Sequence, residues 1–244
     1  MKIKLTITYD GTNYCGWQVQ NNGITVQQVI TEAINKLTGE SVKLNGSGRT
    51  DAGVHAEGQV ASFSVQTESI PPKNYAKALN TLLPEDVKII SSQKVDEDFD
   101  ARYSAKRKTY EYRLYESSVV LPLKERYAVR VEEGLNLERL QTALNEFVGE
   151  KDFKSFCASK SGAKTTVRTI YSAIAKKENG FIVIEFCGNG FLYNMVRILC
   201  GTALGYAQGK ITLEEIRKMF LEDNRSLGGK TLLAKGLTLK SVEY

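Results

Sequence analysis

The chain has 244 residues, 42% of them hydrophobic and 25% charged, so it can bury a core that needs neither disulfides nor metal ions. The net charge of +5 is too small to identify a nucleic-acid partner unless the basic side chains cluster. The four cysteines form no C-x-x-C pair and His55 is the only histidine, which argues against a Cys/His metal site. No apolar run approaches ~20 residues, and unbridged thiols are typical of a cytoplasmic protein.

The first half of the chain predicts alternating strands and helices. Residues 2–9 alternate apolar and polar side chains, as a half-buried strand does. Thr25-Val26-Gln27-Gln28 is a capping-box sequence, and helical spacing follows it as far as Gly39. Further strands are predicted at 42–44, 54–65 and 87–95, and a second helix at 71–83.

The second half predicts the same order, with no residue-level repeat between the halves. Strands are predicted at 109–115, 167–176, 181–186 and 237–243, and helices from residues 136, 191 and 212. We therefore expect an α+β fold of two ferredoxin-like (RRM-like) β-α-β-β-α-β halves with mostly antiparallel sheets. The expected domains are residues 1–104 and 105–244.

Residues 46–56 form a polar, glycine-punctuated loop, the kind of segment on which a scaffold holds reactive groups. Arg49 and Asp51 are two residues apart, and a nearby guanidinium favours a charged carboxylate, whose reference pKa is ~3.9. Asp51 is then suited to act as a nucleophile. From the spacing alone, a hairpin turn carrying a surface ion pair is the favoured interpretation of this loop. A phosphate-binding loop is disfavoured because no G-x-x-x-x-G-K-[ST] occurs, and His55 is more typical of a packed side chain than of a general base.

A basic stretch interleaved with aromatic residues follows in Lys106-Arg107-Lys108-Thr109-Tyr110-Glu111-Tyr112-Arg113. Such a stretch can track RNA phosphates while a ring stacks on an unpaired base, but an edge strand with solvated lysines has the same pattern. Arg197 lies in a largely apolar helical segment. It is either a buried structural arginine or a second cation of the site.

Several of these segments resemble, in order, the motifs of the tRNA pseudouridine synthase A family. The loop Gly48-Arg49-Thr50-Asp51-Ala52-Gly53-Val54-His55-Ala56 is similar to the signature loop of that family, and a set of further blocks spans most of the chain. Those blocks are Tyr9-Asp10-Gly11-Thr12 with Tyr14 and Gly16-Trp17-Gln18, Asp98-Phe99-Asp100-Ala101-Arg102-Tyr103-Ser104-Ala105, Asp152-Phe153 with Ser155-Phe156, and Phe191 with Met195-Val196-Arg197 and Gly201.

The resemblance implies an isomerase that converts uridine to pseudouridine at positions 38, 39 and 40 of the tRNA anticodon stem-loop. It implies Asp51 as the catalytic carboxylate, Tyr110 against the target base, no cofactor and no metal. Beside this resemblance, Arg49 and Arg197 are the candidates for supporting the site, and the basic stretch described above makes Lys106, Arg107 and Lys108 candidates for RNA binding. The resemblance further implies a cytoplasmic homodimer that holds tRNA across both subunits, with a catalytic cleft between the two halves of each chain and a flipped-out target base.

The chain differs from the family pattern at a few positions that bear on substrate range, namely Asp100, Tyr193, Asn194 and residues 232–234 around Leu233. By alternation Tyr112 points the same way as Tyr110, so either ring is a candidate for the base contact.

Two other functions stay open. A non-catalytic protein of two RRM-like halves is disfavoured because no R/K-G-F/Y-G/A-F-V-x-F/Y string is present. A pseudouridine synthase of another family, acting on rRNA, is disfavoured by the motifs quoted above.

Overall fold

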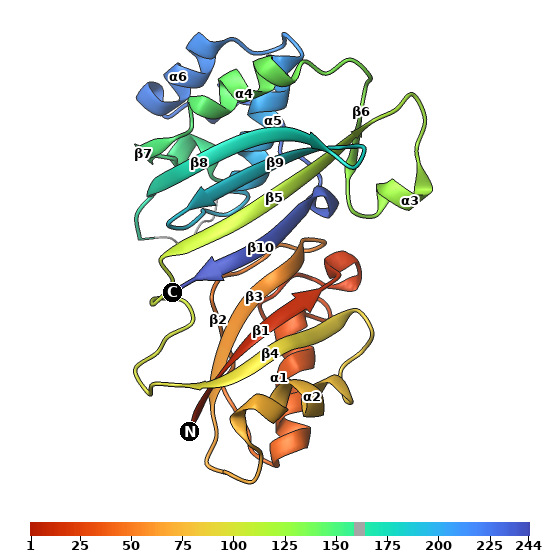
Figure 1. Ribbon diagram of the computed structural model, residues 1–244. Coiled ribbons are helices and arrows are strands. Elements are labelled where there is room, and N and C mark those ends of the chain that lie inside the picture. The colour runs from red at the N-terminus through yellow and green to blue at the C-terminus, as the bar shows by residue number, and fades with distance from the viewer. Residues whose placement is uncertain (159–163) are drawn as a thin grey trace. The chain divides into compact units, whose positions relative to one another are not determined.

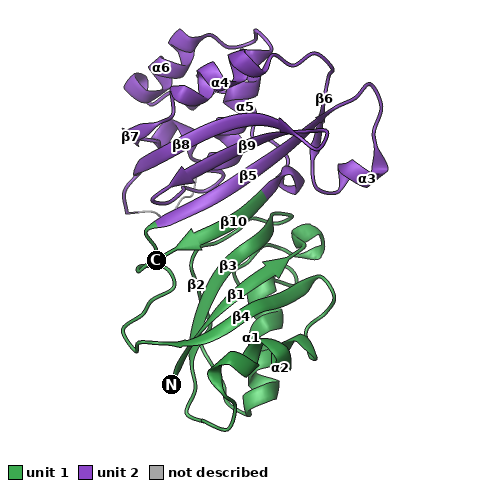
Figure 2. Ribbon diagram, in the orientation of Figure 1, with its two compact units in different colours: residues 1–106, 238–244 green, residues 107–237 purple. Residues whose placement is uncertain are grey.

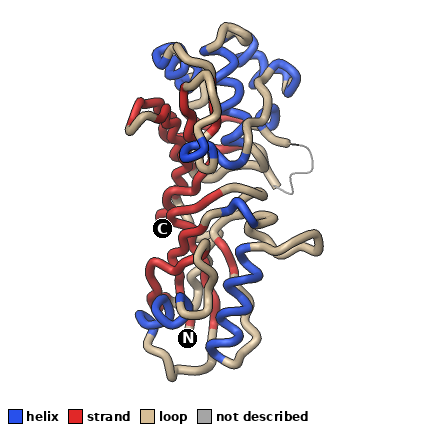
Figure 3. Tube along the Cα trace, turned by 90° about the vertical axis from the view of Figure 1, so that its right-hand side faces the viewer, coloured by secondary structure: helices blue, strands red, loops and turns tan. Residues whose placement is uncertain are grey.

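The computed structural model describes residues 1–158 and 164–244, and it divides into two compact units (Figures 1 and 2). Unit 1 comprises residues 1–106 and 238–244, and unit 2 comprises residues 107–237. Seen from the side, the strands of each unit have helices packed against them (Figure 3). The predicted α+β fold with mostly antiparallel pairing is confirmed.

Unit 1 follows the predicted β-α-β-β-α-β order, but its second strand is Asn45–Gly46, beyond residues 42–44 where a strand was predicted. Its elements are β1 (Lys2–Tyr9), α1 (Val26–Thr38), β2 (Asn45–Gly46), β3 (His55–Ser64), α2 (Tyr75–Asn80) and β4 (Val87–Val95), joined by β10 (Leu237–Glu243) from the end of the chain. The strands are ordered β4-β1-β3-β10, and β2 pairs with β3. β1 is antiparallel to both of its neighbours, whereas β10 runs parallel to β3 with Thr238 opposite His55.

Local sequence explains most boundaries in unit 1. Alternate residues of β1 are fully buried, including Ile3 and Leu5, as its period-two pattern predicts. The Thr25 side chain accepts a hydrogen bond from Gln28 N at the start of α1, and Gly39 ends the helix in the left-handed region at φ 75°. The predicted second helix is shorter than expected, because a 3-10 turn occupies residues 72–74 before α2.

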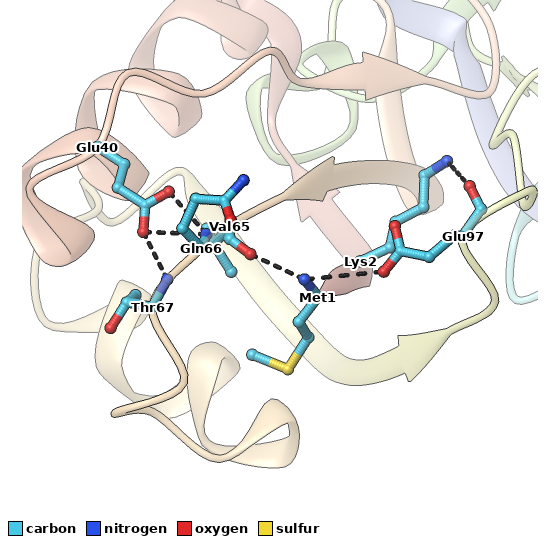
Figure 4. Close-up of polar contacts among 7 residues, drawn as sticks. All are labelled: Met1, Lys2, Glu40, Val65, Gln66, Thr67 and Glu97. Carbon is cyan, nitrogen blue, oxygen red and sulfur yellow. Dashed lines mark hydrogen bonds and ion pairs between the residues drawn. The ribbon is translucent and has the colours of Figure 1, made fainter.

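The start of β1 is tied to the loop after β3 by polar contacts drawn in Figure 4. The amino group of Met1 donates to Val65 O at 2.8 Å. The Glu40 carboxylate accepts from the backbone N–H groups of Gln66 and Thr67, which holds the pKa of Glu40 below its usual range.

Unit 2 contains more elements than the predicted order. They are β5 (Arg107–Glu116), α3 (Pro122–Glu125), β6 (Val129–Val131), α4 (Leu137–Asn145), β7 (Gly149–Asp152), β8 (Val167–Glu178), β9 (Phe181–Gly188), α5 (Met195–Ala207) and α6 (Leu213–Glu222). The strands are ordered β5-β9-β8-β7, and β6 pairs in parallel with β5. α3, β6 and β7 were not predicted because segments of three or four residues are too short to show a period.

The longest apolar helix of unit 2 is α5, most of whose residues are buried. It begins at Met195 and not at the predicted Phe191, since Asn194 takes φ 60° and breaks the helical conformation before it. Within residues 1–158 and 164–244, no helix combines the length and apolar character needed to cross a membrane.

Candidate active site

The loop between β2 and β3 holds Asp51 at the start of a tight turn. Val54 N donates to Asp51 O at 3.1 Å, and Gly53, at the third position, has φ 78°. A type II turn requires positive φ at that position, which glycine adopts without strain. Asp51 is half-buried and Ala52 is exposed, so the turn leaves the aspartate partly accessible while its backbone is fixed.

The segment after β1 packs directly on this loop. Trp17 N donates to Thr50 O at 3.0 Å. A Cβ on Gly16 would lie 2.5 Å from Thr50 O, and a Cβ on Gly46 would lie 2.4 Å from Trp17 Nε1. These approaches are closer than any side chain allows, so glycine at both positions is a condition for docking the loop.

Arg49 belongs to the same loop as Asp51, so both predicted residues lie on one short segment of unit 1. The Arg49 side chain is exposed. The Nε of Arg49 donates to Gln18 Oε1 at 3.0 Å. The segment that carries Trp17 and Gln18 therefore also orients the guanidinium of Arg49, two residues before Asp51.

Two buried polar side chains from outside the loop, Gln59 and Tyr9, contact its residues, and these contacts were not predicted. Gln59 is fully buried, and its Nε2 donates to Gly48 O at 3.0 Å while its Oε1 accepts from Ser47 Oγ at 2.6 Å. The hydroxyl of Tyr9 and Thr50 Oγ1 are 2.8 Å apart, also in the interior. Little in the sequence pointed to Gln59, because β3 also contains the polar residues Glu57, Ser62 and Ser64.

His55 contributes contacts to the fold of unit 1. It is 5% exposed, and its Nδ1 lies 3.0 Å from Gly11 N, which donates to it, and 3.1 Å from Asp10 Oδ1. These contacts hold the turn after β1 to the start of β3, which is the packed role that its sequence context favours.

Unit 2 carries the two candidate aromatic residues, and their surroundings differ. The Tyr110 ring lies 5.1 Å from the Phe191 ring in an edge-to-face arrangement, with 8% of the residue exposed. Tyr112 is fully buried, and its hydroxyl donates to Leu233 O at 2.7 Å. Burial raises the pKa of Tyr112 above its ordinary value, so that its hydroxyl stays protonated and committed to this contact.

Arg197, in the first turn of α5, makes structural contacts. Its Nε donates to Leu232 O at 2.7 Å, and its Nη1 donates to Asn194 Oδ1 at 2.7 Å. The side chain is half-buried. It therefore ties the start of α5 to the segment before β10, whatever further role it has.

The basic stretch at the start of β5 is divided between two faces. Lys106 and Arg107 are exposed, and the Arg107 guanidinium lies 5.0 Å from the Tyr171 ring. Lys108 is half-buried and lies opposite Gly188 of β9. Alternation along the strand puts Lys108 on the same face as Tyr110 and Arg107 on the other.

Within the described part of the chain, no group of three or more His, Cys, Asp or Glu residues is arranged to hold a metal ion.

The sequence matches the tRNA pseudouridine synthase family over residues 5–104 and 143–244. The chain belongs to this family. It is 46% identical over 244 residues to tRNA pseudouridine synthase A of Ruminiclostridium cellulolyticum, covering 100% of this chain and 99% of that protein. It is 47% identical over 242 residues to tRNA pseudouridine synthase A of Caldicellulosiruptor bescii, covering 99% of each.

Members of the tRNA pseudouridine synthase family isomerise uridine to pseudouridine in tRNA, so the family, the isomerase class and the reaction predicted from the motifs are confirmed. Among the positions that depart from the family pattern, Asn194 takes a left-handed φ of 60° before α5, whereas Asp100, Tyr193 and Leu233 lie in a turn or at the surface. Asp100 accepts from the backbone N–H groups of Arg102 and Tyr103 at 2.7 and 2.8 Å, which closes a turn. Tyr193 and Leu233 are 49% and 57% exposed, so their side chains do not define the core.

Proposed function

We propose that this tRNA pseudouridine synthase acts at positions 38, 39 and 40 of the anticodon stem-loop, with Asp51 as its nucleophile and without a cofactor. The observation that carries the proposal is the fixed turn at Asp51, within the loop that resembles the family signature. A half-buried carboxylate on a backbone fixed by close glycine contacts is suited to reaction at one atom of a bound nucleotide.

The reaction breaks the N1–C1′ bond of uridine and forms a C5–C1′ bond, while C5 loses a proton and N1 gains one, so the composition does not change. On one route Asp51 attacks C1′ as uracil leaves through N1, and the carboxylate is released when C5 bonds to C1′. On a second route the carboxylate takes the C2′ proton as uracil leaves, which gives a glycal, and the proton returns to C2′ when C5 bonds to C1′. Both routes use the Asp51 carboxylate, at C1′ on the first route and at the adjacent C2′ on the second.

Three further residues are proposed to serve the reaction. Tyr110 would stack against the target base, which its slight exposure beside Phe191 supports, whereas the Tyr112 hydroxyl is engaged by Leu233. Arg49, exposed on the Asp51 loop, would support the carboxylate or a phosphate of the substrate. Arg197 would add a second cation, although its contacts to Leu232 and Asn194 give it a structural role as well.

The proposed partner is the anticodon arm of tRNA, bound by a homodimer in the cytoplasm. Lys106, Arg107 and Lys108 would neutralise phosphates, with Lys108 on the face of β5 that carries Tyr110. The target uridine would be flipped out of its stack before C1′ is reached. In the proposed domain arrangement, the N-terminal half, residues 1–104, carries Asp51. The C-terminal half, residues 105–244, carries Tyr110 and Arg197.

The test is to incubate unmodified tRNA and rRNA separately with the purified protein and to map pseudouridine at nucleotide resolution. The proposal predicts modification at positions 38, 39 and 40 of tRNA and none in rRNA. Modification confined to rRNA would contradict the substrate assignment. Binding of tRNA without any modification would instead indicate a non-catalytic RNA-binding protein.

A further inference from the structure

The amide of Gln59 joins β3 to the loop that carries Asp51. Its Nε2 donates to Gly48 O at 3.0 Å, and its Oε1 accepts from Ser47 Oγ at 2.6 Å and from Val60 N at 3.1 Å. Gln59 and Ser47 are both fully buried. The side chain therefore uses donor and acceptor together to fix two consecutive residues of the loop, three and four positions before Asp51.

A second buried contact holds the residue next to Asp51. The Tyr9 hydroxyl lies 2.8 Å from Thr50 Oγ1, and only 4% of Tyr9 is exposed. Burial raises the pKa of Tyr9 well above its ordinary value, so the hydroxyl remains protonated and able to donate. Gln59 and Tyr9 reach the loop from adjacent strands, β3 and β1, that pair with each other.

Burying a polar side chain is costly, and the cost falls when its donors and acceptors have partners. On the face of β3 that Gln59 shares by alternation, Ala61 and Phe63 are apolar and buried. An apolar side chain at position 59 would pack there without the cost of burying an amide, but it would leave Gly48 and Ser47 without their hydrogen bonds to this side chain. The Gln59 amide therefore fixes the conformation of the loop at Ser47 and Gly48.

Catalytic groups need to be held within about 0.5 Å of their productive position. Two of the three residues before Asp51 are held in this way: Gly48 by Gln59, and Thr50 by the Tyr9 hydroxyl and the Trp17 N–H group. The hydrogen bonds beneath the loop do not reach the solvent-exposed side of Arg49. Their removal would change the position of the carboxylate more than the binding of RNA phosphates.

We infer that Gln59, assisted by Tyr9, is a positioning residue that holds the Asp51 loop in its reactive geometry. The inference rests on the proposed function, in which the Asp51 carboxylate reacts at the uridine. It concerns the rate of the chemical step and not the affinity for tRNA.

The variants that test this inference are Gln59→Met and Tyr9→Phe, each close in shape to the original side chain. Gln141→Met is a matched control, because the Gln141 amide likewise accepts from Ala175 N at 2.8 Å and donates to Ala173 O at 2.9 Å, but in unit 2. For each protein, kcat and KM for tRNA are measured together with the melting temperature.

We expect Gln59→Met to lower kcat by about 10²-fold at unchanged KM, since a misplacement of about 1 Å has an effect of that size. Tyr9→Phe should lower kcat in the same direction by a smaller factor, because it removes a single hydrogen bond. Gln141→Met should reduce the melting temperature and leave kcat and KM unchanged. A merely structural role for Gln59 would make its variant behave as Gln141→Met does.

Asp51→Asn, measured in parallel, separates the inference from the proposed function. Turnover by Asp51→Asn would overturn the catalytic assignment itself. An inactive Asp51→Asn protein together with a folded Gln59→Met protein of wild-type kcat would overturn only the positioning role. If Gln59→Met fails to fold, Tyr9→Phe decides: a lowered kcat at unchanged KM supports the inference, and a wild-type kcat overturns it.

Discussion

Tyr110 and Tyr112 are two residues apart in β5 and therefore lie on the same face of the strand. A matched pair of substitutions separates their roles. Tyr110→Leu should lower kcat/KM for tRNA, because base–aromatic stacking is worth about 1–3 kcal/mol. At about 1.4 kcal/mol per tenfold change, the expected loss is about 5- to 140-fold. Leucine keeps apolar bulk against Phe191, so the loss of stability should be limited to the ring interaction, about 0.5–1.5 kcal/mol.

Tyr112→Leu is the control, since it changes the same side chain on the same face of the strand. It should mainly lower the melting temperature, because Tyr112 is fully buried and its hydroxyl bond to Leu233 O contributes about 0.5–1.5 kcal/mol. Its kcat/KM, measured below the melting transition, should stay near the wild-type value.

Tyr110→Phe then tests the hydroxyl alone. If the hydroxyl relays the proton lost from C5, this variant should bind tRNA normally and turn over slowly, although a reference pKa of ~10 makes tyrosine a weak base. Turnover is followed by the release of tritium from tRNA whose uridines are labelled at C5. Wild-type kcat/KM for Tyr110→Leu, with a folded but inactive Tyr112→Leu, would refute the choice of Tyr110.

Three more predictions concern binding, cofactors and pH. Lys106→Ala/Lys108→Ala should weaken tRNA binding and reduce the log–log salt slope by about 0.7–0.9 for each phosphate that is no longer neutralised; an unchanged affinity and slope would mean that both lysines face away from RNA. Activity should survive EDTA without added nucleotide, because the sequence has one histidine and scattered cysteines; a loss that metal restores would contradict this. Glu40, whose folded-state pKa is lowered by the N–H groups of Gln66 and Thr67, stabilises the fold above its ordinary pKa of about 4.3 and loses that effect as pH falls through the folded value. Glu40→Gln should therefore lower the melting temperature at pH about 7 and do so less on acidification; a constant difference would contradict the argument.

Local patterns in the sequence were sufficient for much of the fold. The alternation in residues 2–9 gave the bounds of β1, and the capping residue Thr25 with Gly39 gave those of α1. The strand at 237–243 was also predicted from its alternation. Its parallel pairing with β3 was not, because no local pattern encodes a partner some 180 residues away in the chain.

The candidate site was predictable only where its chemistry is visible in residue types. The loop with Arg49 and Asp51 was conspicuous, since polar and glycine residues interrupt two extended stretches. Gln59 was missed, because a polar residue in a strand is usually a solvent-facing member of the alternation, whereas β3 is buried on both faces. Only the three-dimensional contacts with Gly48 and Ser47 reveal what it holds.

The most direct test of the catalytic assignment is pseudouridine formation by Asp51→Asn. The substitution is nearly isosteric and removes the charge that the proposed chemistry requires, so the loss in rate should be at least ~10³-fold. The variant should keep the fold and the affinity for tRNA, because the backbone bond from Val54 N to Asp51 O that closes the turn is available to asparagine as well. Pseudouridine mapped at positions 38, 39 and 40 of tRNA should be absent with Asp51→Asn and present with wild type. Substantial pseudouridine formed by the folded Asp51→Asn protein would contradict the assignment of Asp51 as the nucleophile.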